Sequence, residues 1–215
     1  MTLEKIIAYF AKNSDFFWSS VAQHLGITLV AVAAACLVGI PAGILCARNQ
    51  RVKTVVTGLF TTLRIIPSLA VLLLCIPLIG TGLKPAVIAL SFLAMPPLLI
   101  NTTLAFSTIP APILETALGM GMSRARTFFL VKIPLALPLI LAGFKTAVVE
   151  VIASATLAAY IGAGGLGAII FTGLGLLRAD LLLIGGVSVA IISITADFLL
   201  TRLERRLLRY QQPAC

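Results

Sequence analysis

Residues 115–121, Glu-Thr-Ala-Leu-Gly-Met-Gly, lie in the middle of a polar segment that separates two long apolar runs. This segment covers residues 107–132. Pro110 and Pro112 open it at positions that suit a helix start. Glu115 is expected in the first turn, where a carboxylate complements the helix dipole. The stretch therefore predicts a short helix, and the length of the segment between two apolar runs suggests a docking element.

The rest of the chain is far more apolar than a soluble domain. Of its 215 residues, 60% are hydrophobic and 11% are charged, against about 25% charged in ordinary globular domains. Five apolar runs each exceed about 20 residues, the length that crosses a bilayer as a helix. They cover residues 21–47, 55–79, 85–106, 133–160 and 181–203. Because they lack the period-two alternation of strands, we predict an all-α membrane protein with five transmembrane helices, forming a single domain over residues 1–215.

The N-terminal stretch mixes charged and aromatic side chains and lacks the charge and hydrophobicity order of a cleavable signal. We predict that residues 1 to about 20 form an interfacial helix that stays in the mature protein. The four cysteines include no Cys-x-x-Cys pair, so neither a disulfide framework nor a metal site is expected. They are Cys36, Cys46, Cys75 and Cys215.

The net charge of +9 comes from basic clusters that flank the apolar runs. Ten basic residues fall into three groups: Arg48, Arg51 and Lys53; Arg124, Arg126 and Lys132; and Arg202, Arg205, Arg206 and Arg209. Such spacing is typical of cytoplasmic loops under the positive-inside rule. It predicts a multi-pass protein with its N-terminus outside and its C-terminus in the cytoplasm, and it argues against nucleic acid as a partner.

The central segment resembles the signature of type I ABC importer permeases: Glu-Ala-Ala, three residues, then Gly, followed by an apolar, proline-bounded stretch. The match rests on Glu115 and Ala117, with Thr116 in place of the second residue, and on the glycines that follow, of which Gly121 has the spacing of the signature; it continues to Pro134 and Pro138. The resemblance implies the MetI-like fold and a cytoplasmic coupling helix that docks on an ATPase subunit. It gives the docking role to Glu115, Ala117, Gly119, Met120 and Gly121. The alternative is an amphipathic loop helix on the membrane surface.

The same resemblance implies the surrounding assembly in the bacterial inner membrane. Two permease subunits, identical or paralogous, would sit on two ATPase subunits that hold ATP and Mg, and an extracytoplasmic binding protein would deliver the solute. This chain would bind no cofactor and hydrolyse no ATP. Stretches 64–70, 80–86, 119–122 and 155–167 are similar to permeases for osmoprotectants such as glycine betaine, choline and carnitine. A methionine or other amino-acid importer is the alternative.

Glycines after the fourth apolar run spell the dinucleotide-binding pattern, which has meaning only between a strand and a helix. Because they end a membrane span, we predict instead a tight turn or re-entrant backbone at the outer face. Gly162, Gly164 and Gly167 make up the pattern, and Gly165 belongs with them to the predicted turn.

Four charged residues fall inside the predicted spans: Arg64, Lys145, Glu150 and Asp197. A bare charge there costs at least about 2.5 kcal/mol on insertion scales, so we expect these residues to pair across helices or to line a wet path. The alternative is that Glu150 faces the translocation path and attracts a trimethylammonium group.

An intramembrane enzyme is the main alternative to a transporter. The single histidine, His24, is expected at the outer edge of the first span as an interfacial or turn residue, and Asp197 is the only aspartate within a span. Neither a serine–histidine nor a two-aspartate protease site is therefore predicted. A channel or structural membrane protein remains the third class.

Overall fold

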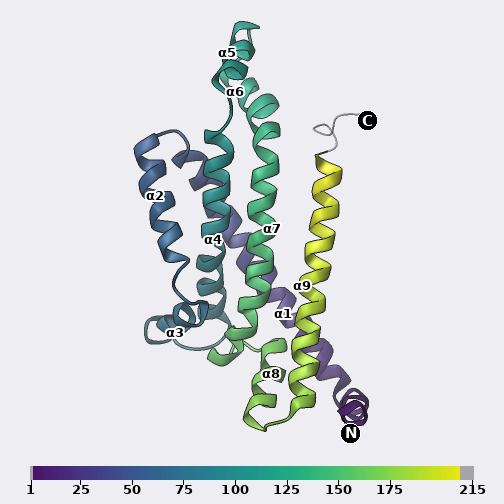
Figure 1. The fold of residues 1–215 in the computed structure, drawn as a ribbon. Helices are drawn as coiled ribbons and strands as arrows, with labels where there is room; N and C mark the ends of the chain where they lie inside the picture. Colours follow the sequence, from purple (N-terminus) through teal and green to yellow (C-terminus); the bar gives the residue numbers. More distant parts are fainter. Residues whose placement is uncertain (1, 209–215) are drawn as a thin grey trace. The chain divides into compact units, whose positions relative to one another are not determined.

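The computed structural model describes residues 2–208, and every regular element in that range is helical (Figure 1). The elements are α1 (Thr2–Cys46), α2 (Gln50–Leu63), α3 (Ser68–Ile79), α4 (Leu83–Ser107), α5 (Ala111–Gly119), α6 (Arg124–Thr127), η1 (Phe128–Lys132), α7 (Ile133–Ala158), η2 (Ala159–Ile161), α8 (Leu166–Gly175) and α9 (Ala179–Leu207). Four of the described helices are long and apolar enough to cross a membrane, and the pair α2 and α3 adds a fifth if it counts as one span. Arg209 and Cys215 lie outside the described residues.

The second predicted span is not one continuous helix. It breaks between α2 and α3, which meet at 92°. Pro67 has φ −57° and ψ 135°, and a proline forces the residue before it away from helical geometry. Arg64 therefore lies at the C-terminal cap of α2 with an exposed side chain, at the break of the predicted span and not inside a continuous helix.

The N-terminal helix is continuous with the first predicted span. A separate helix ending near residue 20 is expected from the sequence, but α1 runs through this position without a break. Its direction changes earlier, at Asn13, which has φ −127° and ψ 24°. Asparagine side chains compete with helical hydrogen bonds, and Asn13 Nδ2 donates to the carbonyl oxygen of Tyr9 over 3.4 Å.

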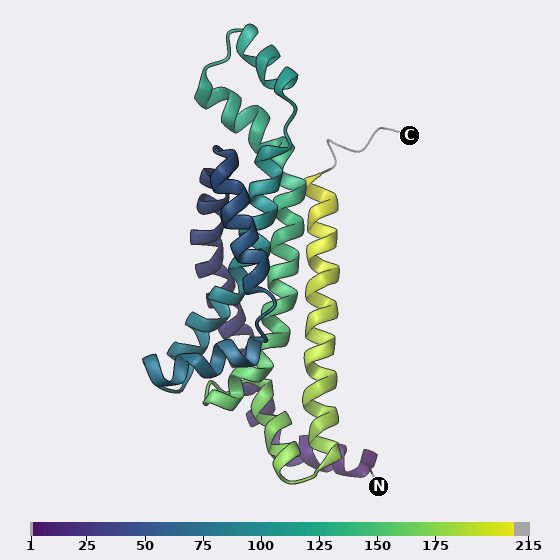
Figure 2. The ribbon, with the colours of Figure 1, turned by 60° about the vertical axis from the view of Figure 1, so that its left-hand side comes forward.

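The chain divides into two compact units. Unit 1 contains Met1–Ala34, Ile66–Ala94 and Val148–Phe198. Its core joins the N-terminal half of α1 to α8 and the first turns of α9 (Figure 2). The buried residues of this core are Tyr9, Phe17, Leu166, Ile169, Leu181 and Ile184.

Unit 2 contains Ala35–Ile65, Met95–Ala147 and Leu199–Cys215. Two glycines let α1 and α7 pack closely on α4. A Cβ atom on Gly43 would lie 2.7 Å from Cβ of Thr102, and one on Gly143 would lie 2.7 Å from the carbonyl oxygen of Pro97. Small residues of this kind bring helix backbones together in membrane proteins.

Charge is distributed very unevenly between the two units. Unit 2 holds twelve of the sixteen basic residues and two of the seven acidic ones, a formal net charge of +10. Unit 1 holds four basic and five acidic residues, a net charge of −1. All three basic clusters of the sequence therefore belong to unit 2.

Candidate functional site

The helix α5 (Ala111–Gly119) is capped at both ends by local backbone structure. Pro110 caps its start with φ −61° and ψ 131°, and Pro112 lies in the first turn, where a missing N–H breaks no helical hydrogen bond. At the other end Gly121 has φ +80°. The N–H of Gly121 donates to Leu118 over 2.9 Å, and that of Met122 donates to Ala117 over 3.1 Å. These two bonds form a Schellman motif, which satisfies the last carbonyl groups of the helix.

The residues assigned to docking differ in their exposure. Glu115, Gly119 and Gly121 are exposed, and Met120 is 72% exposed. Ala117 is only 3% exposed, so its side chain packs inside the segment. Because α5 begins at Ala111, no acidic residue lies in its first turn, and the expectation that Glu115 does is wrong.

A short α-helix and a π-helix connect α5 to α7. The Oγ atom of Ser123 accepts a hydrogen bond from the N–H of Arg126 and caps α6. The π-helix η1 follows directly, a rare element that is frequent at functional sites. The ring of Phe128 stacks on Phe106 of α4 with centroids 5.7 Å apart. The helix then continues through Pro138.

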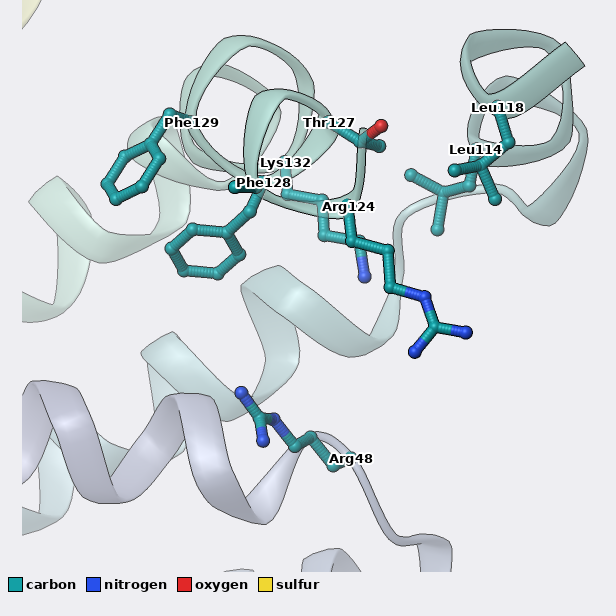
Figure 3. A pocket seen from close by; sticks show the side chains of 9 residues that line it. Arg48, Leu114, Leu118, Arg124, Thr127, Phe128, Phe129 and Lys132 are labelled. Atoms are coloured by element: carbon teal, nitrogen blue, oxygen red, sulfur yellow. The ribbon is translucent and has the colours of Figure 1, made fainter. Parts of the chain in front are cut away.

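Two hollows lie beside α5. One, of about 650 Å³, is lined by Arg48, Leu114, Leu118, Arg124, Ala125, Thr127, Phe128, Phe129 and Lys132 (Figure 3). The other, of about 350 Å³, is lined by Pro112, Ile113, Thr116, Ala117, Met120, Met122 and Val131. The first is basic and the second is almost wholly apolar. Both lie within unit 2.

The glycines after α7 form a turn with left-handed backbone. Gly162, Gly164 and Gly165 have φ of +84°, +79° and +74°, a region that favours glycine because other residues carry a Cβ atom. A Cβ atom on Gly167 would collide with the carbonyl oxygen of Thr156. The N–H of Gly82 donates to the carbonyl oxygen of Ile161 over 2.7 Å, which ties the turn to the start of α4.

Two adjacent polar residues of α1 bond this part of unit 1, Gln23 to the turn and His24 to α7, and the sequence reasoning predicted neither contact. Gln23 Nε2 donates to the carbonyl oxygen of Ala163, and Gln23 Oε1 accepts from the N–H of Gly165, each over 3.0 Å. His24 is fully buried and donates through Nε2 to the carbonyl oxygen of Ile152 over 3.1 Å. His24 is therefore a buried helical residue and not a turn residue, while its place at the outer edge of the span stays a prediction. Two adjacent polar side chains within an apolar run were a sequence signal for such contacts, because polar groups inside a membrane need hydrogen-bond partners.

The four charged residues of the predicted spans are divided between the units. Arg64 and Lys145 belong to unit 2, and Glu150 and Asp197 belong to unit 1. Lys145 Nζ donates to Oγ1 of Thr201 over 2.7 Å. Lys145, Glu150 and Asp197 are all half-buried. Pairing of these residues across helices stays a prediction.

Comparison with known proteins identifies relatives along almost the whole chain. The chain is 41% identical over 205 residues to the carnitine transport permease protein OpuCB of Listeria monocytogenes, covering 95% of this chain and 94% of the relative. It is 36% identical over 205 residues to the choline transport system permease protein OpuBB of Bacillus subtilis, with the same coverage. It is 36% identical over 203 residues to the osmoprotectant import permease protein OsmW of Salmonella typhimurium, covering 92% and 94%.

Solved structures show the same fold. A chain of the inward-facing MetNI methionine ABC transporter matches with a TM-score of 0.75 at 22% identity, covering 92% of this chain and 96% of that one. A chain of an amino acid ABC transporter solved with histidines matches with a TM-score of 0.76 at 21% identity, covering 93% and 97%. The prediction of an all-α, MetI-like fold is thus confirmed. Because the family described as the binding-protein-dependent transport system inner membrane component also matches residues 39–209, this chain belongs to that family of ABC importer permeases.

Proposed function

We propose that this chain is the permease subunit of an ATP-driven importer for quaternary amines such as glycine betaine, choline and carnitine. The observation that carries the proposal is the 36–41% identity, over at least 92% of the chain, to relatives named for carnitine, choline and osmoprotectants. Carnitine and choline share a trimethylammonium group whose charge does not depend on pH. The 22% identity to the methionine transporter supports the fold alone.

The proposed assembly contains two permease subunits, identical or paralogous, and two ATPase subunits that bind ATP and Mg. An extracytoplasmic binding protein delivers the solute, in agreement with the family description as a binding-protein-dependent system. This chain holds no nucleotide in the proposal. In support, its one glycine-rich pattern of the dinucleotide type lies between η2 and α8, without the preceding strand that such a site requires.

In this assembly α5 is the coupling helix that docks on the ATPase. Its closed ends support the assignment, as does the exposure of Glu115, Gly119, Met120 and Gly121. Ala117, which is buried, positions the helix instead of touching the ATPase. Exposed apolar side chains on α5 would also fit the alternative, a helix that lies on the membrane surface. An experiment therefore has to distinguish docking on the ATPase from binding to the membrane.

We further propose that the basic clusters of unit 2 face the cytoplasm. The net charges of +10 and −1 support this orientation through the positive-inside rule. It puts the N-terminus, which belongs to unit 1, outside the cell and the C-terminus, which belongs to unit 2, inside. The turn at Gly162–Gly167 then lies at the outer face, within the same unit as the N-terminus.

Two roles are open to the four charged residues of the predicted spans. Arg64, Lys145, Glu150 and Asp197 can form charge pairs, or Glu150 can attract the cationic solute as it passes. Glu150→Gln separates them, because loss of steering lowers uptake while the subunits still assemble. Unchanged uptake would discard the steering role.

Uptake into proteoliposomes tests the function directly. The chain is reconstituted with its ATPase and binding protein, and uptake of radiolabelled glycine betaine, choline, carnitine and methionine is measured with and without ATP. ATP-dependent uptake of at least one quaternary amine is expected. Methionine uptake alone would overturn the substrate class, and flux without ATP would identify a channel.

The same preparation tests the coupling site. Glu115→Gln removes the exposed carboxylate of α5 and should lower ATP-dependent uptake. The matched control is Glu204→Gln, which removes the other carboxylate of unit 2 and should leave uptake unchanged. Equal loss in both variants would argue that charge, and not the position on α5, is responsible.

A further inference from the structure

The larger of the two hollows beside α5 carries three basic side chains. Arg48 comes from the turn after α1, Arg124 from α6 and Lys132 from η1. Figure 3 shows the amine of Lys132 beside the stem of Arg124, and Arg48 apart from them on another side of the hollow. None of the described residues that line the hollow is acidic. Three separate elements therefore bring like charges to one place.

Such convergence is unfavourable unless an anion joins it, because like charges repel one another over several ångströms. The surroundings offer little relief, since unit 2 as a whole has a net charge of +10. The volume of about 650 Å³ lies within the range of roughly 300–1,000 Å³ that is usual for small-molecule sites. Arginine side chains suit phosphate in particular, because the guanidinium group can donate two parallel hydrogen bonds.

Apolar side chains complete the hollow and extend beyond it. Leu114 and Leu118 of α5 and the ring of Phe128 form part of its wall. Phe129 and Leu130 of η1 are 63% and 61% exposed. A small inorganic anion makes no favourable contact with these apolar side chains. A phospholipid makes such contacts, because its phosphate binds cationic groups while its acyl chains pack on apolar ones beside them.

We propose that this hollow binds the phosphate headgroup of an anionic phospholipid. Arg48, Arg124 and Lys132 surround the phosphate, and Phe129 and Leu130 contact the acyl chains. The inference rests on the proposed function in one respect: the placement of α5 and η1 at the inner face of the membrane. A bound lipid touches both α5 and η1 and holds them at a fixed spacing.

Lipid binding is measured by native mass spectrometry on the full-length chain, purified in detergent and delipidated, with phosphatidylglycerol as the probe. The variant Arg48→Gln, Arg124→Gln, Lys132→Gln should bind it at least tenfold more weakly, since each cation close to the headgroup contributes about fivefold to such affinities. The matched control is Arg51→Gln, Lys53→Gln, Arg126→Gln. It removes the same charge from residues that do not line the hollow and should change binding less than twofold.

Several results would overturn the proposal. Equal weakening in both triple variants would show attraction by general charge alone. If millimolar inorganic phosphate displaced phosphatidylglycerol, the hollow would be a site for soluble anions. Equal affinity for phosphatidylcholine would show that the site does not distinguish an anionic lipid from a zwitterionic one. Loss of the ATPase from the site variant, with phosphatidylglycerol binding unchanged, would show that an acidic surface of the ATPase occupies the hollow.

Two controls keep these outcomes clear. Arg124→Gln alone should weaken binding about fivefold and gives a reading if the triple variant does not fold, which circular dichroism and gel filtration report. Binding in detergent requires no transport, so a wrong substrate class in the uptake experiment leaves this result unchanged. Failure of lipid binding likewise leaves the importer assignment intact.

Discussion

Gln23 Oε1 accepts a hydrogen bond from the backbone N–H of Gly165 over 3.0 Å, and these two residues are separated by 142 positions in the chain. The same side chain donates through Nε2 to Ala163. A single amide therefore satisfies one donor and one acceptor of a turn whose backbone cannot pair with itself as a helix does. The link fixes the glycine turn against α1 within unit 1.

Replacing Gln23 by alanine should destabilise the protein by about 1–2 kcal/mol, because two neutral hydrogen bonds of about 1 kcal/mol each are lost. Thermal unfolding of the detergent-solubilised protein measures the effect. Gln50→Ala is the control, since the Gln50 side chain is exposed at the start of α2. If both variants unfold at the wild-type temperature, the link contributes nothing to stability.

Gly165→Ala should cost about 1–3 kcal/mol from backbone strain alone, because φ +74° with ψ −169° is a conformation open essentially to glycine only. A Cβ atom would also lie 3.3 Å from Nδ1 of the buried His24. Gly58→Ala should have the opposite sign, because Gly58 lies inside α2 with nothing within 4 Å of the added atom. There alanine should stabilise the helix by about 0.5–1 kcal/mol. Equal effects at both positions would contradict the strained conformation of Gly165.

Buried and exposed positions of α5 should respond differently. Ala117→Leu should destabilise the protein by about 1–3 kcal/mol, because it adds volume to a packed site. Met120→Ala should leave the unfolding temperature unchanged, since Met120 is 72% exposed, but should reduce ATP-dependent uptake. A large stability loss with Met120→Ala would mean that this side chain packs within the chain instead of on a partner.

Cysteine labelling checks the proposed orientation. With the native cysteines replaced by serine, Leu177→Cys introduces a thiol at a residue that is 92% exposed between α8 and α9. An impermeant maleimide should label it on intact cells. Met120→Cys should be labelled only after the inner membrane is permeabilised. The reverse pattern would place unit 1 at the cytoplasmic face and would refute the orientation.

The sequence was most informative where local chemistry decides the structure. Pro110 and Pro112 predicted the start of a short helix close to the one observed. The break before Pro67 was missed because the apolar run continues across the break. A hydropathy pattern shows how apolar a segment is but not whether the helix changes direction. The ten-residue helix α8 was missed for the opposite reason, since it lies in a stretch that reads as a glycine-rich loop.

The partners of Gln23 and His24 could not be predicted, because they lie more than 120 positions away in the chain. Their polarity showed that partners were needed, but not where the partners were. The basic hollow was missed for a related reason. Arg48, Arg124 and Lys132 were each assigned to topology, and only folding brings them to the same space.

The closed ends of α5 have a mechanical consequence. A helix of nine residues is too short to be stable alone in water. Without caps, α5 would unwind at its ends when a force acts on it. Pro110 at one end and the Schellman motif at Gly121 at the other prevent this. If α5 is the coupling helix, a force on its exposed face acts on a capped helix that connects the end of α4 to α6, η1 and α7. In the proposed assembly, the two caps therefore keep this nine-residue helix intact as a short rigid link.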